Sequence, residues 1–78
     1  MQNHSFQLLL DGVPYDVKAF PFKFNEGIRY RVRFNSSPEY VFAWDESATQ
    51  YIAIDDDSTQ IPANVETEIA LHLQKLPV

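Results

Sequence analysis

Three arginines lie close together and are the residues whose spacing most directly suggests binding chemistry. Arg29, Arg31 and Arg33 alternate with large apolar residues between Ile28 and Phe34. Successive side chains of a β-strand point to opposite faces, so this alternation predicts a strand with one apolar face and one guanidinium face. Guanidinium groups bind carboxylates and phosphates through paired N–H donors. The segment therefore predicts a sheet face that either is solvated or binds an anionic partner.

The arginine face is expected to carry small apolar groups as well. Residues 40–44 predict a neighbouring strand, and the residues between its aromatic side chains share the arginine face. Arginine beside apolar groups is a composition found at protein interfaces. The candidate partner-binding residues are Arg29, Arg31, Arg33, Val41, Ala43 and Pro21.

No arrangement of residues in the sequence predicts catalysis. The two histidines are His4, near the start of the chain, and His72, within a predicted helix. Nucleophilic or acid–base catalysis needs a second group placed against such a histidine, and no spacing in the sequence supplies it. The chain has no cysteine, which excludes thiol catalysis and thiolate metal sites. We therefore predict a non-enzymatic protein without a cofactor or metal ion.

One acidic segment partly matches a calcium-binding loop. Asp55, Asp57, Thr59 and Glu66 have the spacing of the first, third, fifth and twelfth positions of an EF-hand loop. However, Gln60 stands where that loop needs glycine, and a strand is predicted where a helix normally precedes the loop. The pattern favours a solvated turn before a helix, and whether Asp55–Asp57 binds a cation stays open.

Length and composition predict one small folded domain, residues 1–78. A chain of 78 residues with 45% hydrophobic residues can bury one core and has no room for a second domain. The lack of cysteine, of a signal peptide and of an apolar stretch of about 18 residues favours a cytoplasmic protein without a membrane segment. The formal charge of −5 opposes binding to nucleic acid, except where the arginines gather.

The first predicted element is a hairpin around Asp11-Gly12. A two-residue Asp-Gly loop favours a type I′ turn. This turn pairs apolar residues on one face: Leu10 with Val13, Leu8 with Tyr15, and Phe6 with Val17. The turn chemistry and the apolar pattern therefore predict the same register.

The second predicted hairpin turns at residues 25–27. A three-residue loop with Gly27 in the left-handed conformation would place Phe20, Phe22 and Phe24 opposite apolar residues of the arginine strand. A two-residue loop would instead place Phe22 opposite Arg31. We therefore predict the three-residue loop, with a bulge near Lys18–Phe20 that brings the three rings into the core.

The remaining pattern predicts two more strands and a helix. Strands are expected at residues 40–44 and 50–54, the latter with apolar residues on both faces. Apolar residues then recur with a helical period over residues 62–76. The predicted fold is α+β: an antiparallel four- to five-stranded β-meander, about residues 5–54, with one C-terminal helix on its aromatic face. Trp44 and Phe22 are expected under that helix.

The predicted function follows from the face that the helix leaves open. We expect a protein–protein interaction or self-association module that uses this face or the first strand, whose Leu8–Leu10 segment carries no charge to prevent edge pairing. The partner is an unidentified protein or a second copy of the chain. The alternative is binding of nucleic acid or another anionic ligand by the row of Arg29, Arg31 and Arg33.

Overall fold

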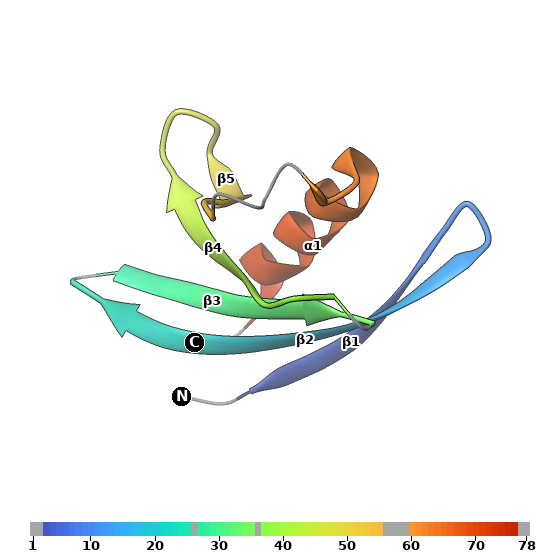
Figure 1. Ribbon diagram of the computed structural model, residues 1–78. Coiled ribbons are helices and arrows are strands. Elements are labelled where there is room, and N and C mark those ends of the chain that lie inside the picture. Colours follow the sequence, from blue (N-terminus) through green and yellow to red (C-terminus); the bar gives the residue numbers. More distant parts are fainter. Residues whose placement is uncertain (1–2, 26, 36, 56–59, 77–78) are drawn as a thin grey trace.

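The computed structural model describes residues 3–25, 27–35, 37–55 and 60–76, and Figure 1 shows its ribbon. Five antiparallel strands follow one another in the order β1-β2-β3-β4-β5, and a helix follows the last strand. The elements are β1 (His4–Leu10), β2 (Val13–Phe24), β3 (Gly27–Phe34), β4 (Tyr40–Asp45), β5 (Gln50–Ala53) and α1 (Ala63–Lys75). The α+β meander is confirmed, and the fifth strand forms.

The sheet is strongly curled, and α1 packs on its concave face. In Figure 1, β4 turns out of the plane of β3, and the helix lies inside the curl. The buried core between them consists mainly of residues from β1 to β4 and from α1, and Tyr51 and Ala53 of β5 pack against it. Its fully buried large side chains are Tyr30, Phe42, Ile69, Leu73, Val17, Val32 and Val65. No helix is long and apolar enough to cross a membrane in the described residues, 3–25, 27–35, 37–55 and 60–76.

The first hairpin forms in the predicted register. Leu10 pairs with Val13, and the alignment continues along the strands to His4 and Ala19. Asp11 and Gly12 have φ angles of 52° and 78°, so both loop residues adopt the left-handed conformation that a type I′ turn requires. The predicted pairing of apolar residues on the helix side is therefore confirmed.

The predicted register of the second hairpin is wrong. Phe24 pairs with Gly27 and Phe22 with Arg29, which leaves a two-residue loop with Asn25 at φ 56°. Strand β2 continues for 12 residues, so its alternation is maintained without the predicted bulge. Ala19 lies opposite Val32 on the helix side, and the phenylalanines at even positions lie on the arginine side. Val17 and Ala19 of β2, rather than its phenylalanine rings, therefore face the core.

The helix forms close to its predicted limits, but it covers a different part of the sheet. It buries Val65, Ile69, Ala70 and Leu73, and Pro62 immediately precedes it. Trp44 has the parity of the helix side but is 46% exposed. Phe22 lies on the opposite face of the sheet, beside Arg29. The prediction that Trp44 and Phe22 lie under the helix is therefore wrong.

Polar side chains of α1 bind the free edge of the sheet at β5. The N–H of Ala53 donates to the Glu66 carboxylate at 3.2 Å, and the Gln74 amide donates to the Thr49 carbonyl at 3.3 Å. Edge strands carry backbone groups that can pair with another chain unless they are covered. Glu66 and Gln74 therefore hold the helix in place and cover this edge.

Replacement of Glu66 by alanine is expected to lower the free energy of unfolding by about 1 kcal/mol, because the Ala53 N–H loses its partly buried acceptor. Urea unfolding measures the change. Glu68→Ala is the matched control, since it removes the same side chain from the same helix on the side that faces β1. Equal stability of the two variants would contradict the role given to Glu66.

The core contains one hydroxyl group without a described partner. Tyr30 is fully buried, and its Oη makes no hydrogen bond within the described part of the chain. Its ring meets that of Tyr51 edge to face, with the ring centroids 5.5 Å apart. Burial, and in second place the nearby Tyr51, raises the pKa of Tyr30 above its ordinary value, and burial raises the pKa of Tyr51. Both phenols therefore resist ionisation in the folded protein.

Candidate binding face

The convex face of β2 and β3 combines aromatic rings with arginines. The register pairs Phe20 with Arg31 and Phe22 with Arg29, so these side chains lie on the same side of the sheet. The residues of this surface, called here the Phe–Arg face, are Phe20, Phe22, Phe24, Arg29, Arg31 and Arg33. The helix lies on the other side of the sheet, so the arginines point away from it, as predicted.

The arginines of the Phe–Arg face stack on its rings. The Cζ atom of Arg29 lies 3.9 Å from the centroid of the Phe24 ring, and that of Arg31 lies 4.5 Å from the centroid of Phe22. A guanidinium group over an aromatic face gains a cation–π attraction, and the ring limits its movement. Stacking uses the flat side of the guanidinium, so its N–H donors at the edge stay available to an anion.

A single carboxylate is close to two of these arginines. Glu39 lies 3.9 Å from Arg31 and 4.0 Å from Arg33, measured between nitrogen and oxygen. The two arginine side chains are 52% and 59% exposed, so solvent screens both ion pairs. These distances are longer than those of a good charge-assisted hydrogen bond. A carboxylate of another molecule can therefore displace Glu39 at little cost.

Five of the six candidate residues lie together, and one does not. Val41 pairs with Arg31, and Ala43 is two residues further along β4, so both share the arginine side. Pro21 pairs with the core residue Tyr30 and lies on the helix side, which corrects its predicted place. The error has the same cause as the wrong register, because a strand without a bulge carries Pro21 into line with Val17 and Ala19.

The phenylalanines are the residues of this face that the sequence prediction missed. The sequence predicts them in the core, because apolar side chains normally define the buried face of a strand. The regular alternation of Val17, Ala19 and Pro21 was the signal for the true register. With these small residues facing inward, no bulge is needed, and the rings fall beside the arginines.

A notch opens at one end of the Phe–Arg face, where β3 and β4 separate. Their pairing is limited to Tyr30–Val32 with Tyr40–Phe42, although both strands extend further. The cavity of about 270 Å³ that results is lined by Phe24, Asn25, Gly27, Ile28, Arg29, Ala43, Trp44 and Tyr51. Phe24 and Trp44 are each 46% exposed. The notch thus adds an aromatic recess to the face.

Both histidines lie on the helix side of the sheet, away from the Phe–Arg face. His72 stacks on Phe6 at 4.6 Å between centroids, and its Nδ1 lies 3.2 Å from the Glu68 carbonyl oxygen. His4 lies on β1, at the far end from the Asp11 turn. Residues 3–25, 27–35, 37–55 and 60–76 contain no group of three or more potential metal-binding side chains. His72 therefore has a packing role against β1.

Two acidic residues of the segment that resembles a calcium loop, Asp55 and Glu66, accept hydrogen bonds from the backbone of the sheet. A carboxylate oxygen of Asp55 accepts a hydrogen bond of 2.7 Å from the Val41 N–H. Glu66 accepts from the Ala53 N–H. Asp57 and Thr59 lie outside the described residues. Asp55 is thus bonded to β4 and Glu66 to β5.

Comparison with protein-family models, with curated proteins and with solved structures finds no match to this chain. We therefore infer its function from the geometry and chemistry of its surfaces.

Proposed function

We propose that this protein is a non-enzymatic interaction domain whose Phe–Arg face binds an acidic segment of a partner protein. The observation that carries the proposal is the stacking of Arg29 and Arg31 on Phe24 and Phe22 on the face that the helix leaves open. Stacked guanidiniums are oriented before binding, so less side-chain entropy is lost when a carboxylate docks.

The chemistry of the face fits a segment with both acidic and apolar side chains. Its arginines supply fork-shaped donors that bind carboxylates in a bidentate manner. Its rings, together with Val41 and Ala43, supply apolar area between the charges. Aromatic residues and arginine are enriched at protein interfaces and among the residues that contribute most to affinity. The notch beside Trp44 offers a recess for an apolar side chain of the bound segment.

Trp44 allows a direct binding test, because it is the single tryptophan of the chain and lines the notch. Titration with a synthetic peptide of alternating glutamate and leucine is expected to change its fluorescence. R29S/R31S is expected to weaken binding by about tenfold or more, since two charge-assisted contacts and their stacking are lost. Circular dichroism checks that the variant remains folded.

The matched control is K23S/K75S, which removes the same number of positive charges. Lys23 has the parity of the helix side, and Lys75 lies at the end of α1. If both double variants weaken binding equally, net charge alone explains the effect, and the proposed face is wrong. Unchanged binding by R29S/R31S leads to the same conclusion.

Binding of single-stranded nucleic acid is the second candidate function. The observation that favours it is the presence of three rings beside three arginines on one open sheet face. Such surfaces stack bases and contact phosphates. Three phosphate contacts predict a slope of about −2 to −3 in a plot of log affinity against log salt. An oligothymidylate that binds more tightly than the acidic peptide at equal salt would favour this function over the first.

A further inference from the structure

The two edges of the sheet are protected to different degrees. At β5, Glu66 binds the Ala53 N–H, and Gln74 binds the adjoining Thr49 carbonyl. At β1, no side chain of the described residues makes a comparable hydrogen bond to the outer backbone. β1 also lacks the bulge, proline or charged residue that commonly discourages edge pairing. One edge is therefore covered by the helix, and the other is open.

The outward backbone groups of β1 follow from the turn at its end. In a two-residue hairpin the closing pair, Leu10 with Val13, is hydrogen-bonded, and hydrogen-bonded pairs then alternate along the ladder. Ser5, Gln7 and Leu9 therefore direct their N–H and C=O groups away from β2. Leu9 is also 73% exposed, the most exposed large apolar side chain of the described residues.

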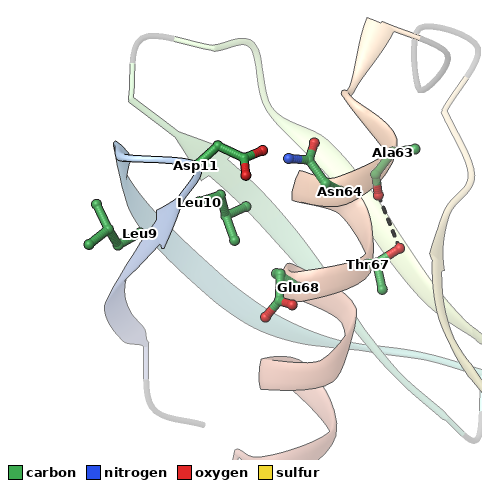
Figure 2. Close-up of a pocket in the computed structure, with 7 residues that line it drawn as sticks. All are labelled: Leu9, Leu10, Asp11, Ala63, Asn64, Thr67 and Glu68. Atoms are coloured by element: carbon green, nitrogen blue, oxygen red, sulfur yellow. Dashed lines mark hydrogen bonds between the residues drawn. The ribbon is translucent and has the colours of Figure 1, made fainter.

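A groove runs between the end of β1 and the helix (Figure 2). It has a volume of about 440 Å³ and includes the apolar side chains of Leu9, Leu10 and Ala63. Leu10 points toward the helix and Leu9 away from it, while the Asp11 and Glu68 carboxylates lie on opposite sides of the groove. The strand edge is thus flanked by apolar area and by two carboxylates.

We infer that two copies of this chain associate by pairing their β1 strands antiparallel about a two-fold axis at Gln7. In this register Gln7 faces Gln7 of the second copy, and Ser5 faces Leu9 of the second copy. All of these residues direct their backbone groups outward, so they form the hydrogen-bonded pairs of the new ladder. The two sheets then join into one continuous sheet. This inference is independent of the proposed function, because it uses a different surface.

Charge and polar groups favour a second copy as the occupant of this edge. β1 carries no acidic or basic residue apart from His4, so self-pairing places no like charges opposite each other. The register puts His4 of the second copy opposite Leu10, on the groove side, next to Asp11 and Glu68.

The affinity of this dimer is expected to change with salt concentration in a defined direction. Each copy has a formal charge of −5, so two copies repel each other at long range. Salt screens this repulsion and leaves short-range backbone pairing intact. The dimer is therefore expected to become stronger as salt increases. Contacts of the Phe–Arg face with acidic groups are expected to weaken under the same conditions.

Sedimentation equilibrium of the purified chain over a range of concentrations, at about 0.05 M and about 0.5 M NaCl, tests the inference. We expect a monomer–dimer equilibrium that shifts toward dimer at the higher salt. Gln7→Lys places two ammonium groups directly opposite each other and is expected to weaken the dimer by about fivefold or more. Gln50→Lys on β5 is the control, because it adds the same charge at the covered edge.

The Gln50→Lys control distinguishes pairing of β1 from association through another surface. Either lysine lowers the net negative charge by one, so association through any other surface would be unchanged or strengthened by both variants. Weakening by Gln7→Lys alone supports pairing of β1. A monomer at every concentration, a dimer that salt dissociates, or equal effects of the two variants would overturn the inference.

Discussion

Replacement of Phe42 by alanine is expected to leave most of the protein unfolded at room temperature. Phe42 is fully buried between the helix and the centre of the sheet. Truncation of such a ring costs about 3–5 kcal/mol, and a domain of this size is stable by little more than that. Trp44, two residues along the same strand, is 46% exposed, and its replacement by alanine is expected to cost only about 1–2 kcal/mol.

Circular dichroism and urea unfolding of Phe42→Ala and Trp44→Ala measure this difference. Both variants lose an aromatic ring from the same side of β4, so they differ in burial more than in chemistry. If Trp44→Ala were the less stable variant, the end of β4 would have to lie under the helix. That result would contradict the curl of the sheet described above.

The protein is expected to lose stability in alkaline solution, and Tyr30 is expected to contribute to this loss. Its pKa is raised above the ordinary value of 10.0, first by burial and then by Tyr51. Above pH of about 10 the unfolded chain releases the phenol proton while the folded chain retains it, so rising pH favours unfolding. The contribution of the neutral phenol is fully present below that pH and is lost as the pH rises through the raised pKa.

Tyr30→Phe provides the test of this alkaline transition. Without the phenol, the midpoint of alkaline unfolding is expected to move to higher pH. At neutral pH the variant is expected to be more stable by about 1 kcal/mol, because the buried hydroxyl without a described partner is removed. Tyr15→Phe serves as the control, since Tyr15 is partly exposed. An unchanged alkaline midpoint for Tyr30→Phe would show that another group controls the transition.

The parts of the fold that could be predicted are those where turn chemistry and the apolar pattern agree. Asp11-Gly12 permits one short turn, and that turn brings apolar residues together in pairs. The helix has a continuous apolar stripe through Val65, Ile69 and Leu73, with Pro62 before it. In each case two independent physical requirements give the same answer, and the structure confirms it.

The second hairpin shows why the rest could not be predicted in the same way. The turn around Asn25 is compatible with loops of two or three residues, so the apolar pattern alone had to decide the register. The apolar pattern favours the three-residue loop only if a phenylalanine beside an arginine is unfavourable. In the structure Arg29 and Arg31 stack on Phe24 and Phe22, so the pairing is attractive.

The sequence therefore predicted the arginines of the candidate site but not its phenylalanines. The alternation of Arg29, Arg31 and Arg33 is enough to place them on one face, whichever way the neighbouring strand is aligned. The identity of their neighbours depends on the register of β2. A shift of one residue exchanges the two faces of a strand, and here it exchanged Pro21 for the phenylalanines.

The position of α1 after all five strands has a consequence for the synthesis of this protein in the cell. A ribosome makes the chain from its N-terminus, so the complete sheet sequence exists before the helix that covers its concave face and its β5 edge. During that interval Tyr30, Val32 and Phe42 lack their cover, and both edges of any nascent sheet are open. Chains that stop before residue 63 should aggregate or require a chaperone, whereas addition of the helix covers the concave face and the β5 edge and leaves β1 as the open edge.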